Sequence, residues 1–266
     1  MAGHWALGVT TVQMGQARWV PRAQEHLQHG AALARTMDDQ QLIALYAQHP
    51  VVTCQAFAAM ACWMRDAPDQ AAGLLHDTLT LARQLGHPYT LGFALFVDTW
   101  LGIYRQDIAH VRRRADEVIA LAAEQGFPMF TALATITRGW ALAEQGEPKA
   151  GVAEVRRGLA VYQATGAGML RHFLLGLLAQ AHRRARHLDD ALAVLDEALA
   201  VSVASSEHFY QAELHRLKGE LLLDLSADRL AEACKSLSQA VTVAHAQQAL
   251  IFERRAAASL RRLTRP

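Results

Sequence analysis

Histidine is the residue in this chain best suited to bind a transition metal, and the sequence contains 13 of them. Three pairs lie close together along the chain: His26 and His29, His182 and His187, and His208 and His215. None of these pairs is joined by a third ligand at the spacing that metal sites use, and the cysteines do not form a C-x-x-C pair. The pattern therefore favours solvated or capping histidines over a metal site.

Residues that could perform catalysis are present but do not form a catalytic motif. No nucleophile motif places a serine or cysteine in a Ser/His/Asp or Cys/His arrangement. The phosphate-binding pattern G-x-x-x-x-G-K-[ST] is also absent. The sequence therefore predicts no catalytic residues and no cofactor, and an enzyme would need a nucleotide or metal dependence that no motif indicates.

Two short basic clusters, at residues 112–114 and 183–186, could attract an acidic partner. Acidic residues follow each cluster closely: Asp116, Glu117, Asp189 and Asp190. This arrangement favours solvated helix faces with local ion pairs, because a nucleic-acid surface needs a coherent basic stripe. The formal net charge of +1 also argues against an acidic membrane surface. We expect neither nucleic acid nor a membrane as partner.

The composition is typical of an all-α protein. Hydrophobic residues make up 52% of the chain, proline is sparse, and the alternating pattern of β-strands is missing. The N-terminus does not resemble a secretion signal, and no run of about 18 apolar residues could span a membrane. Cys54, Cys62 and Cys234 are too few for a disulfide framework. We expect a cytoplasmic protein with buried free thiols.

Small residues recur along the chain with a period of 40 residues. The first series is Ala59, Thr99, Gly139, Ala179 and Gly219; the second is Ala71, Val111, Gly151 and Ala191; the third is Thr78, Val118, Gly158 and Ala198. Three series in phase indicate that one structural unit is repeated. Residues 129–168 show the unit as two helices joined by the turn Gly146-Glu147-Pro148, with small residues where the helices cross. Each unit must stack on its neighbours to bury its apolar face.

The period divides the chain into helix pairs, one irregular connection and a final helix. We expect pairs at about residues 3–35, 51–88, 89–128, 129–168, 169–208 and 209–249, the connection at 36–50 with a short helical turn at 42–46, and a capping helix at 250–263. The arginines of the last helix suit a C-terminal cap. Apolar residues such as Leu7 and Val9 do not form the polar face that an N-terminal cap requires. We therefore expect an array cut from a longer protein.

The segment 137–159, TRGWALAEQGEPKAGVAEVRRGL, resembles the signature of the tetratricopeptide (TPR) repeat. Gly139 lies in the first helix, Gly146 in the turn, and Gly151 and Gly158 in the second helix. The usual TPR period is about 34 residues, so the period of 40 residues here predicts longer helices. The resemblance implies a TPR-like α-solenoid of about six antiparallel helix pairs and a C-terminal capping helix.

Repeats two to six also resemble the C-terminal TPR region of large bacterial signalling ATPases related to adenylate and guanylate cyclases. The most specific segments are LGHP at 85–88, EQGFP at 124–128, RGWALAEQG at 138–146, ATGA at 164–167 and AELHRLKGELLL at 212–223. In that family a class III cyclase domain and a P-loop ATPase domain precede the repeats, and neither can be located here. The resemblance implies a regulatory or partner-binding module without its output domains.

By TPR register, the first helix of each pair lines a concave surface that binds the partner. The expected partner-binding residues are Phe93, Phe96, Trp100, Tyr104, Trp140, Glu144, Gln180, Arg183, Arg184, Glu213, Arg216 and Glu220. The aromatic first half and charged second half suit an amphipathic peptide or helix. Two alternatives stay open: longer helices could bury the aromatic residues between repeats, and Glu213, Arg216 and Glu220 could pair along one helical face.

These features predict a non-catalytic protein-interaction module. Its partner would be a protein or peptide, or a neighbouring domain of a longer signalling protein. The alternative is a structural remnant of a truncated gene that self-associates through its uncapped first repeat.

Overall fold

The computed structural model describes residues 2–15 and 18–264. In this part of the chain the backbone forms 14 α-helices and one short 3₁₀-helix. The helices are α1 (Ala2–Met14), α2 (Trp19–Ala34), α3 (Asp39–Tyr46), α4 (Pro50–Met64), α5 (Pro68–Gln84), α6 (Pro88–Arg105), α7 (Ile108–Gln125), α8 (Pro128–Glu144), α9 (Pro148–Ala164), α10 (Arg171–Arg184), α11 (Leu188–Ser205), α12 (Gln211–Leu225), α13 (Leu230–Gln247) and α14 (Leu250–Thr264), with η1 (Ala227–Arg229) before α13. The all-α helical-repeat fold predicted from the sequence is thereby confirmed.

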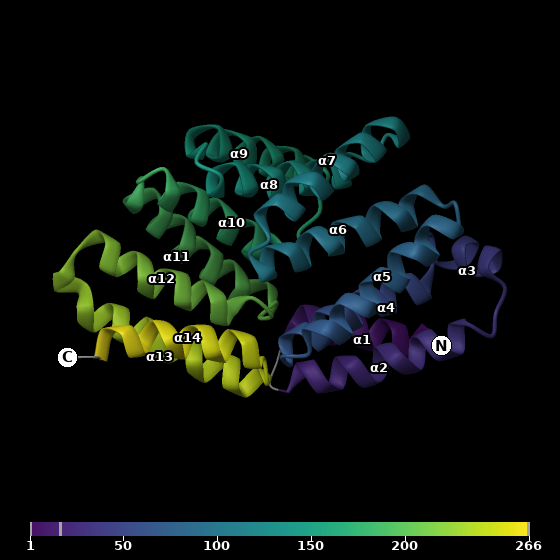
Figure 1. Cartoon of the computed structure of the whole chain (residues 1–266), viewed down its shortest axis with the longest axis horizontal. Coiled ribbons are helices and arrows are strands. Elements are labelled where there is room, and N and C mark those ends of the chain that lie inside the picture. The colour runs from purple at the N-terminus through teal and green to yellow at the C-terminus, as the bar shows by residue number, and fades with distance from the viewer. Residues whose placement is uncertain (1, 16–17, 265–266) are drawn as a thin grey trace.

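Consecutive helices pack in pairs that follow one another along an arc, from α1–α2 through α8–α9 to α12–α13, and α14 packs on the last pair (Figure 1). From α4 to α13, the first helices of the pairs form an inner layer, and the second helices form an outer layer. All 15 residues of the inner helix α4 are buried. The outer helix α11 buries only one stripe along its length: Ala191, Leu195, Ala198 and Ser202. The inner layer is therefore the core of the solenoid.

Local sequence signals explain where the helices begin and end. Proline occupies the start of five helices, α4, α5, α6, α8 and α9, where its missing N–H leaves no hydrogen bond unmade. Gly126 ends α7 in the left-handed conformation with φ of 69°, which glycine adopts without strain. The connection 36–50 contains α3, which begins at Asp39, so the helical turn expected at 42–46 is the second half of a longer helix. Asp38 caps α3 by accepting a hydrogen bond from the Gln41 backbone N–H.

Glycine allows the two helices of the fourth pair to approach until their backbones touch. A Cβ atom placed on Gly151 of α9 would lie 2.6 Å from the Gly139 carbonyl oxygen and 2.8 Å from the Ala143 nitrogen. A Cβ atom on Gly139 of α8 would lie 2.8 Å from the Val155 nitrogen. Backbone atoms cannot move aside as a side chain can, so these positions admit only glycine without a shift of the helices.

Aromatic rings from α6, α10 and α14, and from Tyr210 before α12, fill the middle of the arc. Trp100 of α6 stacks on Phe173 of α10 with 5.0 Å between ring centroids. Tyr104 of α6 stacks on Tyr210, which precedes α12, at 5.9 Å and nearly parallel. Phe252 of α14 meets Tyr104 edge-on at 5.4 Å. Because these rings meet across the arc, the inner face is a packed core rather than an open groove.

The first repeat and the last repeats meet at a seam. The His208 backbone N–H donates to the Met14 carbonyl oxygen at 3.0 Å. The Gln247 side-chain amide donates to the carbonyl oxygens of Gly15, at 2.7 Å, and His208, at 2.8 Å. A Cβ atom on Gly15 would fall 2.1 Å from the Phe209 nitrogen. The seam joins residues more than 190 positions apart in the sequence and closes the arc.

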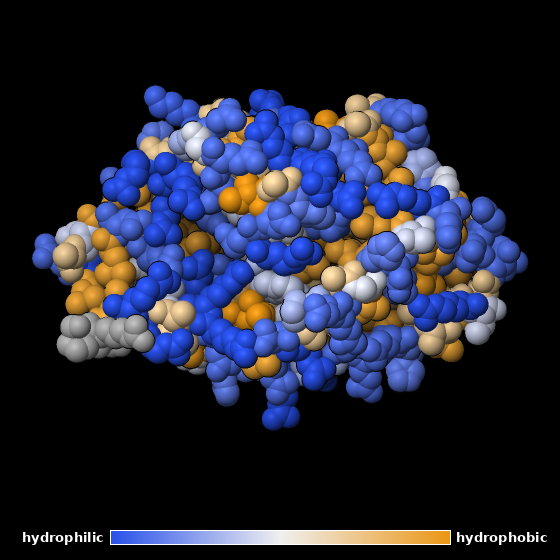
Figure 2. Space-filling model, in the orientation of Figure 1, coloured by the Kyte–Doolittle hydropathy of each residue, from blue (hydrophilic) through white to orange (hydrophobic). Residues whose placement is uncertain are grey.

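Polar residues cover most of the surface in the view of Figure 2, with hydrophobic patches scattered between them. No helix in the described part of the chain is long and apolar enough to cross a membrane.

Replacing glycine with alanine should have opposite effects at two positions on outer helices. Gly151→Ala is expected to destabilise the fold by about 1–3 kcal/mol, because the added methyl group overpacks the crossing with α8. Gly73→Ala in α5 meets no atom within 4 Å, and it should stabilise the fold by about 0.5–1 kcal/mol through helix propensity. Urea unfolding followed by circular dichroism measures both free energies of unfolding. Equal stabilities for the two variants would contradict the close crossing.

Candidate functional site

A charged basin of about 470 Å³ opens at the C-terminal ends of the inner helices. We define it by the residues that line it: Gln106, Glu144, Gln180, Arg183, Arg184, Arg186, Arg216, Leu217, Glu220, Asp224 and Arg262. They come from the ends of α6, α8, α10, α12 and α14, and Arg186 lies in the turn after α10. Arginine is well suited to helix C-termini, where its charge complements the negative end of the helix dipole.

Glu220 is the centre of the ion network in the basin. Its carboxylate accepts hydrogen bonds from Arg183 at 3.0 Å, from Arg216 at 2.6 Å and from the Ser259 hydroxyl at 2.7 Å. Arg183 also donates to Asp224 at 2.6 Å. Three helices, α10, α12 and α14, are therefore joined through one carboxylate.

The same contacts shift the pKa values of the network. Burial alone would raise the pKa of Glu220, but Arg216, Ser259 and Arg183 outweigh burial and lower it to about 2. Burial likewise opposes the charge of Arg216, yet Glu213 and Glu220 hold its pKa above the usual range. Both groups are thus held in their charged forms at neutral pH.

A second pair crosses from α10 to α8 on the other side of the basin. Arg184 donates from Nε to both carboxylate oxygens of Glu144, at 2.9 and 3.0 Å, and from Nη2 to Oε2 at 2.5 Å. The Glu144 side chain is only 6% exposed, whereas Arg184 is 58% exposed. One turn earlier, the Trp140 indole N–H donates to the Gln180 amide oxygen at 3.2 Å. Arg184 therefore has one edge fixed by Glu144 and the rest of its guanidinium open to solvent.

The structure separates the two halves of the residue set expected from TPR register. In the aromatic half, Phe96, Trp100, Tyr104 and Trp140 are buried at 3% exposure or less, and the partly buried Phe93 packs on Phe57. These aromatic side chains are therefore packed between repeats and do not line an open binding surface.

The charged half gathers around the basin. Glu144, Gln180, Arg183, Arg184, Arg216 and Glu220 all line it. Glu213 lies beneath, 4% exposed and paired with Arg216 along α12 at 2.6 and 2.9 Å. Arg216 also pairs with Glu220 on the same helix, so pairing along the helical face occurs together with the contacts between repeats.

Sequence reasoning missed several lining residues and one neighbour of a histidine pair. Asp224 and Arg262 were detectable, because Asp224 lies 41 residues, about one period, from its partner Arg183, and Arg262 lies 42 residues from its partner Glu220. The Asp190 carboxylate lies near His182 and His187 across the α10–α11 turn. A turn breaks helical spacing, so the sequence pattern did not reveal this neighbour.

No family model matches the chain. An uncharacterized protein of Rhizobium meliloti (strain 1021) is 22% identical over 205 residues, which are 77% of this chain and 20% of that protein. The chain thus spans about a fifth of the length of this curated relative.

Solved structures with the same arrangement of helices include TPR-repeat proteins. A Rap protein complexed with Competence and Sporulation Factor superposes with a TM-score of 0.58 at 12% identity, over 92% of this chain and 71% of that one. A signal transduction ATPase with numerous domains (STAND) and a tetratricopeptide repeat sensor, from Pyrococcus horikoshii, superposes with a TM-score of 0.53 at 12% identity, over 97% of this chain and 41% of that one. At these identities the likeness shows a TPR-like fold. It does not assign the chain to the cyclase-related ATPases.

The stability of the fold should fall in acid because of Glu220. Its pKa is lower in the folded chain, about 2, than the ordinary value of about 4.3 in an unfolded chain. The stabilisation is therefore complete above about pH 4.5 and is lost as the pH falls toward 2, by on the order of 2–3 kcal/mol. Urea unfolding at several pH values in this window measures the loss.

Glu220→Gln removes the titrating group, so its free energy of unfolding should change less over the same window. Glu25→Gln on α2 is the matched control, because Glu25 is exposed and lies outside the network. Identical acid profiles for the wild type and Glu220→Gln would contradict the role of this carboxylate.

Proposed function

We propose that this chain is a non-catalytic protein-interaction module that binds an acidic segment of a protein partner, or of a neighbouring domain in a longer protein, at the charged basin. The observation that carries the proposal is the excess of positive charge in the basin. Five arginines line it against three carboxylates, Glu144, Glu220 and Asp224, and Glu213 beneath Arg216 is a fourth, so the basin keeps one net positive charge and presents the exposed Arg186 and Arg262. A partner carboxylate would complement them.

The arginines divide into two groups by exposure. Arg183 and Arg216 are 31% and 14% exposed and are held by carboxylates of this chain. Arg262 is 71% exposed, and Arg186 is exposed with no ion pair in the described part of the chain. Arg186 can pair with a partner without breaking the network, and Arg262 would give up only its 3.5 Å contact with Glu220 and its hydrogen bond to Ser259. Arginine binds carboxylates through two parallel hydrogen bonds, which gives such recognition its geometry.

The comparisons support binding and a larger parent protein. A Rap protein of this fold is complexed with Competence and Sporulation Factor, and a STAND protein of this fold carries the repeats as a sensor. The Rhizobium meliloti relative is about five times longer than the segment it shares with this chain. We propose that the chain corresponds to the TPR part of a signalling ATPase of the cyclase-related kind, acting as its regulatory, partner-binding arm.

The binding proposal can be tested with a fluorescein-labelled oligoglutamate peptide as the probe. Fluorescence anisotropy should show binding of this peptide and none of matched oligoglutamine and oligolysine peptides. The double variant Arg186→Gln, Arg262→Gln should bind about tenfold more weakly or worse, because each charge-assisted hydrogen bond contributes about 1.5–3 kcal/mol. Added salt should weaken binding by the wild type, because exposed charges are screened.

Arg113→Gln is the matched control, since it removes an exposed arginine from the outer helix α7. It should bind like the wild type. Unchanged binding by the double variant, or equal binding of the oligolysine peptide, would refute an acidic partner at the basin. Sedimentation of the same samples shows whether a second copy of the chain occupies this surface instead.

A further inference from the structure

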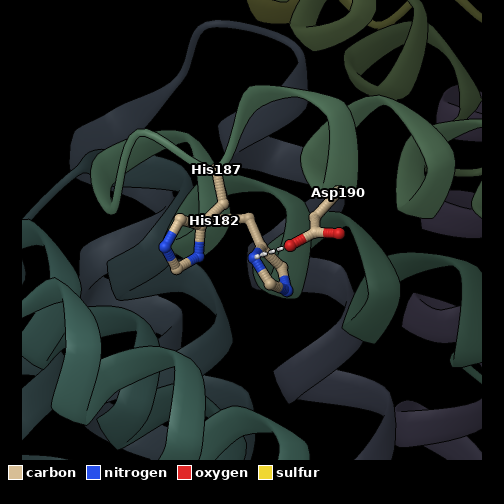
Figure 3. A group of neighbouring side chains, drawn as sticks. All are labelled: His182, His187 and Asp190. Carbon is tan, nitrogen blue, oxygen red and sulfur yellow. Dashed lines mark ion pairs between the residues drawn. The ribbon is translucent and has the colours of Figure 1, made fainter.

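Three side chains with metal-binding chemistry converge at the turn between α10 and α11 (Figure 3). His182 lies in the last turn of α10, His187 directly precedes α11, and Asp190 lies in the first turn of α11. Each side chain offers one ligand atom, and these atoms all lie within 4.8 Å of one another. The cluster is separate from the lining of the charged basin.

One of the three groups is buried without a hydrogen-bond partner. His182 is 1% exposed, and its Nδ1 atom makes no hydrogen bond to any described residue. The Asp190 carboxylate oxygen lies 3.7 Å away, which is too far for a hydrogen bond. A buried polar atom left unpaired costs about 1–3 kcal/mol. A ligand bound between His182 Nδ1 and the Asp190 carboxylate would remove this cost.

We propose that His182, His187 and Asp190 bind a divalent transition-metal ion of the zinc class. Imidazole nitrogen and carboxylate oxygen bind zinc at about 2.0–2.2 Å, so two ligands of a tetrahedral ion lie about 3.4 Å apart. The separation of 3.7 Å between His182 Nδ1 and Asp190 Oδ2 is close to this value. His187 is exposed and Asp190 is 61% exposed, so both can rotate to complete the site.

The site has a route for the ion and a position for a fourth ligand. His182 is buried and forms the inner side of the site, whereas His187 and Asp190 are exposed. Three protein ligands leave one tetrahedral position to water or to a group from a partner. The same turn carries Arg186 of the charged basin, so a bound ion would fix the backbone that positions this arginine.

Arg156 of α9 opposes the ion. Its guanidinium lies 3.3 Å from Nε2 of His182, and because a guanidinium only donates, Nε2 accepts in this arrangement. A metal on Nδ1 needs the proton on Nε2, so the exposed Arg156 side chain must turn away. Its positive charge also repels a cation. Arg156→Gln should therefore tighten metal binding severalfold.

The test uses the full chain without an affinity tag, freed of metal with a chelator. Titration with Co²⁺ should give the visible absorption of a four-coordinate site at one ion per chain, and Zn²⁺ should displace it. Asp190→Asn and His187→Ala should each weaken Co²⁺ binding at least tenfold, because each removes a ligand. Circular dichroism checks that every variant is folded.

His29→Ala is the matched control. His4, His26 and His29 form a second group of histidines, in which the rings of His4 and His29 stack at 5.3 Å. Loss of Co²⁺ binding only in His29→Ala would place the ion there and overturn the proposal. The absence of binding to the wild type, or wild-type affinity in both Asp190→Asn and His187→Ala, would overturn it as well and leave water as the partner of His182 Nδ1.

Discussion

Neighbouring repeats stack in register, so that residues one period apart in the sequence touch in space, and the rest of the structure depends on this constraint. Four side-chain hydrogen bonds show the spacing: Trp140 to Gln180 and Arg184 to Glu144 at 40 residues, Arg183 to Asp224 at 41, and Ser259 to Glu220 at 39. Within the fourth pair, α8 and α9 cross on Gly139 and Gly151 with their backbones in contact, which aligns these two helices. Residues one period apart in the sequence therefore lie on neighbouring helices of the inner layer.

The closure of the arc decides where this protein can interact. In an open solenoid the inner helices present a concave surface to a partner. Here Trp100, Phe173 and Phe252 meet other rings across the middle, and the seam at Gln247 holds the ends together. The inner helices from α4 to α12 therefore expose only their ends. At one of these ends the side chains are charged, and this is the basin that we propose for recognition.

The sequence predicts the repeat and its helix boundaries well, because periodic small residues and helix-starting prolines are local signals. The charged residues selected by TPR register gather around the basin, because residues one period apart come together once the repeats stack, and their role in binding stays a prediction. The sequence cannot predict whether the side chains of Trp100 and Tyr104 are buried or exposed. Whether these rings line a groove or fill a core depends on closure, and closure depends on contacts such as Gln247 to Gly15, which are 232 residues apart. The position of Asp190 beside His182 depends on the geometry of a turn and is hidden for the same reason.

The arginines of the basin differ in how firmly the ion network holds them. Glu220 is 18% exposed and is shared by helices α10, α12 and α14. Breaking a buried pair of this kind leaves an uncompensated charge, so Arg183 and Arg216 are bound to the fold and cannot be released to a partner. Arg186 stands outside the network, and Arg262 lies at its edge, 71% exposed and 3.5 Å from Glu220, where an exposed ion pair contributes little to folding. A partner of the proposed kind would therefore engage the outer arginines while the inner ones keep the repeats in register, and its binding would not require the module to unfold or open.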